Sequence, residues 1–173
     1  MDQLLLSTLD TAKVKGAEYA DIRSVETSQE RFVVRNGAVE TITRDESTGF
    51  GVRVLINGAW GFASSPEITA DNLNKTTALA IQIAKASASH NRNTVDLGPA
   101  VTSKGTYITP IEIDPFKIPL DQKIELLLES DKSMAAVKKI RSRLSSLVFI
   151  REHKIFANTE GAYTDQTLSL IHI

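Results

Sequence analysis

The sequence predicts an α+β fold in which helices pack on one face of a largely antiparallel β-meander sheet. Two Asn-Gly pairs, at 36–37 and 57–58, each separate two segments of alternating apolar and polar residues. Asn-Gly in that setting is the strongest short signal of a β-hairpin. Three other segments repeat apolar residues at helical spacing. The order helix, strands, helix, long connection, helix, strands is typical of helices gathered on one face of an antiparallel sheet.

Three helices are predicted from these apolar stripes. They cover residues 3–15, the segment from Thr69 to Ser89, and residues 120–137. Thr69 is a suitable N-cap, because a hydroxyl can accept a hydrogen bond from a free backbone N–H of the first turn. The stripes contain Leu5, Leu9 and Ala12 in the first helix, Leu73, Thr77, Ala80 and Ala84 in the second, and Leu120, Ile124, Leu127, Leu128, Asp131 and Met134 in the third.

Strands are predicted on both sides of each Asn-Gly turn, and again at 139–151, 154–158 and 162–173. Trp60 and Phe62 fall on one face of their strand and are interpreted as core residues. The alternation in 49–56 places Phe50, Val52, Val54 and Ile56 on one face and Gly51, Arg53 and Leu55 on the other.

The whole chain, 1–173, is interpreted as one domain with three parts. Residues 1–88 form a helix, the meander and a second helix, and residues 120–173 form a helix plus strands. Between them, 89–119 holds four of the five prolines and is expected to be a crossing connection with at most short strands. The last residues, 170–173, lie within an apolar strand, which is an exposed edge unless something covers it. Two explanations stay open: a fragment of a longer protein, or an end covered by a partner subunit.

Composition excludes several classes of function. The chain has no cysteine, which excludes disulfides, thiolate metal sites and a cysteine nucleophile. A net charge of -1 argues against a basic nucleic-acid-binding protein. No signal peptide or stretch of about 20 apolar residues is present, so we expect a cytoplasmic protein without a membrane span.

No catalytic, metal-binding or substrate-binding residue can be assigned from motifs. The three histidines, His90, His153 and His172, belong to no His-Glu-x-x-His pattern. Glu152-His153 matches the end of the inverted motif, but Phe149 stands where that motif needs its first histidine. We interpret Glu152 and His153 as a surface pair.

Other chemically suggestive residues also have simple structural interpretations. Gly49-Phe50-Gly51 leads into a strand, so these glycines are expected to allow close approach within a sheet. The neighbouring acids Asp45 and Glu46, and Glu18 with Asp21, are interpreted as solvated charges.

A basic segment lies between Lys132 and Lys154. Seven cations and one carboxylate, Glu152, give it a local charge of +6. Arg141 and Arg143 are predicted to share one face of a strand. The segment is either a patch for phosphate or an acidic partner, or the solvated face of that strand, and the absence of interleaved aromatic residues favours the solvated face.

Four ordered motifs resemble the N-terminal region of the TldD/PmbA family, also called peptidase family U62 or modulators of DNA gyrase. The later segment Asn158-Thr159-Glu160-Gly161 resembles the family's Asn-Ser-x-Gly turn. The resemblance covers nearly all of this chain but only the first part of a family member. The motifs are Tyr19-Ala20-Asp21-Ile22-Arg23, Val34-Arg35-Asn36-Gly37-Ala38-Val39-Glu40, Gly49-Phe50-Gly51-Val52-Arg53-Val54 and Gly58-Ala59-Trp60-Gly61-Phe62-Ala63-Ser64.

The resemblance implies a part of a cytoplasmic zinc metallopeptidase that cleaves unfolded peptides. TldD-like subunits carry His-Glu-x-x-x-His downstream of this region, and PmbA/TldE-like subunits lack the motif and pair with them. No catalytic residue carries over, so the segment itself is expected to hold no cofactor, with zinc bound elsewhere in a homo- or heterodimer. The variant of the glycine and tryptophan motifs favours a TldD-like member. The alternatives are a PmbA/TldE-like partner and a free-standing scaffold that binds peptides by strand addition at the edge 162–173.

Overall fold

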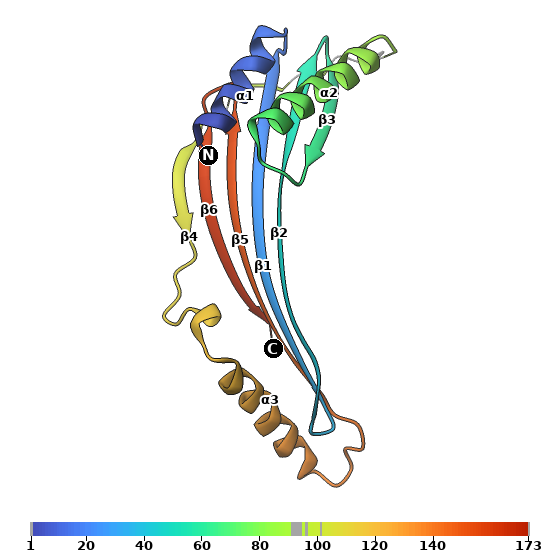
Figure 1. Cartoon of the computed structure of the whole chain (residues 1–173), viewed down its shortest axis with the longest axis vertical. Helices are drawn as coiled ribbons and strands as arrows, with labels where there is room; N and C mark the ends of the chain where they lie inside the picture. The colour runs from blue at the N-terminus through green and yellow to red at the C-terminus, as the bar shows by residue number, and fades with distance from the viewer. Residues whose placement is uncertain (1, 91–94, 96, 101, 173) are drawn as a thin grey trace. The chain divides into compact units, whose positions relative to one another are not determined.

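A computed structural model describes residues 2–90, 95, 97–100 and 102–172 of the chain (Figure 1). The chain divides into two compact units, each described here by itself. Unit 1 comprises Met1–Glu26, Ser47–Tyr107 and His153–Gln166, and unit 2 comprises Thr27–Glu46, Ile108–Glu152 and Thr167–Ile173. The helices are α1 (Asp2–Val14), α2 (Ala70–Ala88), the short 3-10 helix η1 (Pro115–Lys117) and α3 (Leu120–Ala135). The strands are β1 (Tyr19–Arg35), β2 (Ala38–Ile56), β3 (Ala59–Ser65), β4 (Lys104–Ile108), β5 (Leu144–Asn158) and β6 (Tyr163–His172).

The six strands form one sheet in the order β3-β2-β1-β5-β6-β4. The sheet is mostly antiparallel and carries the helices, so the predicted α+β fold is confirmed. Both Asn-Gly turns are present, with positive φ at Asn36 (49°), Gly37 (81°), Asn57 (49°) and Gly58 (72°), as the hairpin turn requires. In the described residues, no helix is long and apolar enough to cross a membrane.

Several strand boundaries differ from the sequence prediction. Residues 44–48 belong to β2, although their consecutive side chains are all exposed and leave no alternating signal in the sequence. The predicted strands 139–151 and 154–158 form the single strand β5, which begins only at Leu144. In the described residues of the connection 89–119, β4 is a short strand, which agrees with the expectation of at most short strands.

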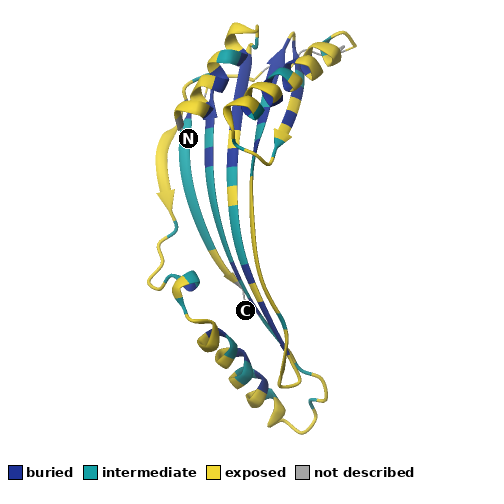
Figure 2. Cartoon of the chain, viewed as in Figure 1, coloured by how far each residue is buried: buried dark blue, intermediate teal, exposed yellow. Residues whose placement is uncertain are grey.

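The core of unit 1 lies between the sheet and the two helices α1 and α2. The predicted stripe residues Leu5, Leu9 and Ala12 of α1 are all buried. In Figure 2 the buried strand segments of unit 1 lie beneath these two helices. The core residues on the sheet include Ala20, Ile22, Phe50, Val52, Val54, Ile56, Ile155 and Ala157, and those on α2 include Leu73, Ala80, Ile81 and Ala84.

Close contact between β3 and α2 depends on Gly61. A Cβ added at Gly61 would lie 2.0 Å from the carbonyl oxygen of Ala80 and 2.5 Å from the backbone nitrogen of Ala84. The small residues of β3 therefore face α2, and the bulky ones face away from it. The prediction that Trp60 and Phe62 are core residues is wrong for Phe62, which is 58% exposed, while Trp60 is partly buried.

The core of unit 2 forms where α3 packs on β1 and β5. Leu127 and Leu128 of α3, both in the predicted stripe, contact a cluster that contains Phe32, Val34, Leu147 and Phe149. The stripe prediction fails at its first residue, because Leu120 is 49% exposed.

Lys123, which the stripe omits, is buried in unit 2. Its Nζ lies 2.5 Å from Oε2 of Glu30, which is also buried. The same Nζ lies 5.5 Å from the ring centroid of Phe32 and 5.0 Å from that of Phe149. The apolar stem of the lysine thus packs in the core while its charge is compensated by a carboxylate and two aromatic faces.

We expect Gly61→Ala to lower the free energy of unfolding by about 1–3 kcal/mol or more, because the new methyl group overlaps the backbone of α2. Gly105→Ala is the matched control, since a Cβ there meets nothing within 4 Å. Urea denaturation of both variants measures the difference. Equal stability of the two variants would contradict the close contact between β3 and α2.

We expect Lys123→Met and Glu30→Leu, each made alone, to cost about 3–5 kcal/mol of stability, because each leaves one charge of the buried pair without its partner. The double variant Lys123→Met/Glu30→Leu removes both charges and should be as stable as the parent chain or more stable. A double-mutant cycle by urea denaturation checks this. Additive losses in the double variant would show that the two charges are not coupled.

Candidate functional site

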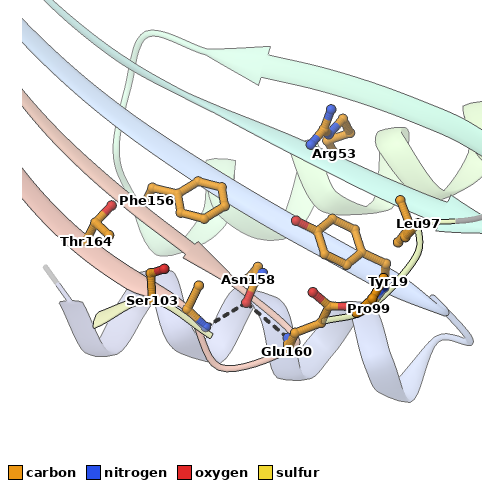
Figure 3. Close-up of a pocket in the computed structure, with 10 residues that line it drawn as sticks. Tyr19, Arg53, Leu97, Pro99, Ser103, Phe156, Asn158, Glu160 and Thr164 are labelled. Atoms are coloured by element: carbon orange, nitrogen blue, oxygen red, sulfur yellow. Dashed lines mark hydrogen bonds between the residues drawn. The ribbon is translucent and has the colours of Figure 1, made fainter. Parts of the chain in front are cut away.

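In unit 1, the sheet face opposite α1 and α2 carries a cavity of about 390 Å³ (Figure 3). Strand pleating places the lining residues of β1, β2 and β5 there, since each alternates with a buried core residue that faces the helices. The cavity is lined by Tyr19 of β1, Arg53 of β2, Phe156 and Asn158 of β5, and Pro99 and Glu160 from loops, among others.

An ion pair between a half-exposed arginine and a buried carboxylate lies beside this cavity. The Nε and Nη2 atoms of Arg53 lie 2.8 Å and 2.6 Å from Oδ2 of Asp21, whose side chain is almost fully buried. The prediction that Asp21 is a solvated charge is therefore wrong. Its neighbours Ala20 and Ile22 face the core, and the opposite face of the strand, to which Asp21 points, is also partly covered. Glu18 is exposed, as predicted, and accepts a hydrogen bond from the backbone N–H of Asn57 at 2.7 Å. The exposed Asp45 and Glu46 also agree with the prediction.

Aromatic rings fix the position of Arg53. Its guanidinium carbon lies 4.5 Å from the ring centroid of Trp60, and Trp60 packs edge-on against Tyr19 with 5.7 Å between the ring centroids. The guanidinium is thus held by a carboxylate in its plane and by an aromatic ring over its face. Nearby, the guanidinium carbon of Arg23 lies 5.3 Å from the ring centroid of Phe156.

The ion pair and burial shift two pKa values. Burial, together with the negative charge of Asp21, raises the pKa of the Tyr19 phenol above 10.0, although a hydrogen bond from Asn158 acts in the opposite direction. Burial alone would lower the pKa of Arg53, but the hydrogen bonds to Asp21 and its charge raise that pKa above its ordinary value. Arg53 therefore keeps its charge, and Tyr19 keeps its proton well into the alkaline range.

The turn after β5 completes the site. The side-chain oxygen of Asn158 accepts hydrogen bonds from the backbone N–H groups of Glu160 (3.1 Å) and Ala162 (2.8 Å), drawn as dashed lines in Figure 3. The Thr159 hydroxyl accepts a hydrogen bond from the backbone N–H of Ala20 at 3.0 Å. The turn is therefore fastened to β1 beside Tyr19.

The structure does not gather the histidines into a site. His90 is exposed beside Ser89, and His153 lies 2.8 Å from Asp165. The side chain of His172 lies outside the described residues. Within the described part of the chain, no group of three or more metal-binding side chains is present.

The glycines of Gly49-Phe50-Gly51 have the predicted steric role. A Cβ at Gly51 would lie 2.8 Å from the ring of Phe62 on the neighbouring strand β3. A Cβ at Gly49 would lie 3.2 Å from the carbonyl oxygen of Ser65.

The basic segment is less charged than its sequence suggests. Arg143 pairs with Asp131 at 3.1 Å, and Arg151 pairs with Asp114. The prediction that Arg141 and Arg143 share one face of a strand is wrong, because β5 begins only after these residues. The backbone N–H of Arg143 instead binds Oδ1 of Asn36 at 2.9 Å.

Sequence reasoning missed the cavity and its ion pair. A usable signal was present, because Tyr19, Asp21, Arg53, Trp60 and Asn158 all come from motifs on which the family resemblance rests. In each strand they occupy the positions that alternate with the apolar ones. Comparing these alternate positions between the motifs would have predicted that the five residues lie on one face of the sheet.

Two family models match the chain in order. Residues 20–84 match the PmbA/TldA metallopeptidase domain 1, and residues 113–173 match the PmbA/TldA metallopeptidase central domain. The chain belongs to the PmbA/TldD family. A metalloprotease of Methanocaldococcus jannaschii is 26% identical over 145 residues, and one of Methanothermobacter thermautotrophicus is 28% identical over 145 residues. Both alignments cover 84% of this chain, and 32% and 30% of the respective relatives, so this PmbA/TldD-family chain spans about a third of their length.

Solved structures show the same fold. A candidate modulator of a DNA gyrase from Thermotoga maritima gives a TM-score of 0.73 at 15% identity, covering 97% of this chain and 37% of that chain. TldE from Thermococcus kodakarensis gives a TM-score of 0.71 at 12% identity, covering 97% of this chain and 38% of that chain. At these identities the likeness shows that this PmbA/TldD-family chain shares their fold.

We expect Tyr19 to lose its proton only above pH 10.0, the ordinary value of a tyrosine. The unfolded chain then loses this proton first, so the free energy of unfolding should fall as pH rises from about 10 towards the raised pKa. The difference in absorbance at 295 nm between the parent chain and Tyr19→Phe isolates this titration. A difference titration at or below pH 10 would contradict the burial of Tyr19 beside Asp21.

Proposed function

We propose that the chain is the N-terminal, non-catalytic segment of a TldD-like zinc metallopeptidase subunit. The match to domain 1 followed by the central domain carries this proposal. The relatives at 26% and 28% identity are both named metalloproteases, which supports the enzymatic member of the family. Zinc and the catalytic residues then belong to the part of such a protein that lies beyond this segment.

The segment's role in that assembly is to form part of the wall of a peptide-binding cleft and of the contact between subunits. The cavity on the open sheet face of unit 1 supports a binding role, because ligand sites are concave, mostly apolar and furnished with a few polar groups. The substrates are unfolded peptides, the partner is a second TldD/PmbA-type subunit, and the compartment is the cytoplasm.

A second candidate is a PmbA/TldE-like partner that itself holds no metal. The fold shared with TldE from Thermococcus kodakarensis favours keeping it. The third candidate, a free-standing scaffold that binds peptides along β6, was based on an open edge at this strand, and β6 is not an edge strand of the sheet. In the sheet β6 lies between β5 and β4, and its Tyr163 N–H donates a 2.9 Å hydrogen bond to the carbonyl oxygen of Ser103.

The experiment reads the gene beyond the codon for Ile173 and assays the whole product with a TldE-type partner. We expect a downstream His-Glu-x-x-x-His, one zinc ion per TldD-like subunit, and hydrolysis of an unfolded peptide that chelation abolishes and zinc restores. Residues 1–173 alone should bind no stoichiometric zinc and cleave nothing. Glutamine in place of the motif's glutamate is the matched inactive control.

Two outcomes would change the assignment. A long product without the zinc motif would establish the PmbA/TldE-like alternative. A product that carries the motif but hydrolyses no peptide with zinc and partner present would contradict the metallopeptidase proposal.

A further inference from the structure

We propose that the cavity of unit 1 binds the carboxyl-terminal end of a peptide, with an apolar last side chain in the cavity and its α-carboxylate on Arg53. The inference rests on the proposed function, because it names the kind of peptide that the segment holds. It depends on three features of the described residues: the orientation of Arg53, the apolar wall of the cavity, and the balance of charge around it.

Arg53 is prepared to bind a second carboxylate. Its Nε and Nη2 donate to Oδ2 of Asp21, at 2.8 Å and 2.6 Å, and the guanidinium also hydrogen-bonds the Tyr19 side chain, while Nη1 is not committed to the Asp21 carboxylate. The side chain is 43% exposed and lines the cavity. Because Asp21 and Trp60 already fix the guanidinium plane, little side-chain entropy remains to be lost when a ligand binds. A planar guanidinium matches the planar geometry of a carboxylate.

The rest of the cavity suits an apolar side chain. Tyr19 and Phe156 present their rings to it, and Leu97, Pro99 and Ala162 add further apolar surface (Figure 3). A volume of about 390 Å³ lies in the lower part of the range of small-molecule sites, which begins near 300 Å³. That space is sufficient for an apolar side chain and the backbone that carries it.

Charge around the cavity favours a monoanion over a phosphate. Asp21 neutralises Arg53, Glu160 also lines the cavity, and Arg23 lies over the outer aromatic wall at Phe156. These four groups sum to zero, so a dianion would face two carboxylates without a surplus of cations. A single carboxylate can bind Arg53 through directed hydrogen bonds while Glu160 weakens its binding.

The direct test compares two forms of one probe on the chain of 173 residues. N-acetyl-Ala-Ala-Leu with a free carboxyl group is titrated beside its C-terminal amide, with fluorescence of the single tryptophan, Trp60, as the readout. Trp60 reports on the site because Arg53 lies over its ring. We expect the acid to bind at least about tenfold more tightly than the amide, the value of one charge-assisted hydrogen bond.

Three variants test whether the acid binds in this cavity and whether the charge of Glu160 raises or lowers its affinity. Glu160→Gln should tighten binding of the acid by about threefold to tenfold, because it removes a repelling charge without touching the ion pair. Arg53→Lys should weaken binding of the acid by about tenfold, since it keeps the charge but loses the planar donor pair. Arg31→Gln, an exposed arginine in unit 2, is the matched control and should leave binding unchanged.

Several outcomes would overturn the inference. Equal affinity for acid and amide, or no binding of either at millimolar concentration, would remove the carboxylate from the site. Weaker binding of the acid to Glu160→Gln would mean that the Glu160 carboxylate attracts the probe rather than repels it, which contradicts an α-carboxylate placed beside it. Because binding is measured without hydrolysis, failure here leaves the metallopeptidase proposal standing, and absence of hydrolysis in the whole product leaves this binding result standing.

Discussion

In a β-strand, successive side chains point to opposite faces of the sheet, and between Tyr19 and Arg23 this alternation decides both the core and the candidate site of unit 1. Ala20 and Ile22 enter the core beneath α1 and α2. Tyr19 and Asp21 point to the other face, where Arg53 and Trp60 meet them. A shift of one residue in the register of β1 would exchange the two sets, burying charges against the helices. The packing of the core therefore determines which side chains form the candidate site.

Buried carboxylates in both units are compensated by cations distant in sequence. In unit 1 Asp21 pairs with Arg53, 32 residues away, and in unit 2 Glu30 pairs with Lys123, 93 residues away. Removing one partner of such a pair is costly because the other charge stays buried, whereas two well-packed apolar residues could replace both. We infer that each pair discriminates between alternative packings more than it stabilises the correct one, and that the pair in unit 2 favours the packing in which Lys123 of α3 faces the sheet.

The sequence predicts the fold well where local chemistry decides it. The Asn-Gly turns, the N-cap Thr69, whose hydroxyl accepts from the Asn72 N–H at 3.3 Å, and the stripe of α1 all follow from neighbouring residues. The site depends instead on contacts between distant strands, and a polar residue such as Asp21 has the same sequence pattern whether it is solvated or paired. The burial of Lys123 was missed for a related reason. A lysine beside an apolar helical stripe is buried only when a carboxylate such as Glu30 pairs with it.

Two glycines allow close packing on both faces of the β2–β3 strand pair. Gly61 lets α2 approach the covered face, and Gly51 leaves room for the ring of Phe62 on the open face. In the β2–β3 register Arg53 lies opposite Phe62, and Leu55 lies opposite Trp60. Arg53 thus lies beside two aromatic residues of β3, and the ring of Phe62 can lie close to β2 only because Gly51 lacks a side chain. A larger residue at 51 would displace the ring of Phe62, so this glycine determines how closely that ring packs over β2.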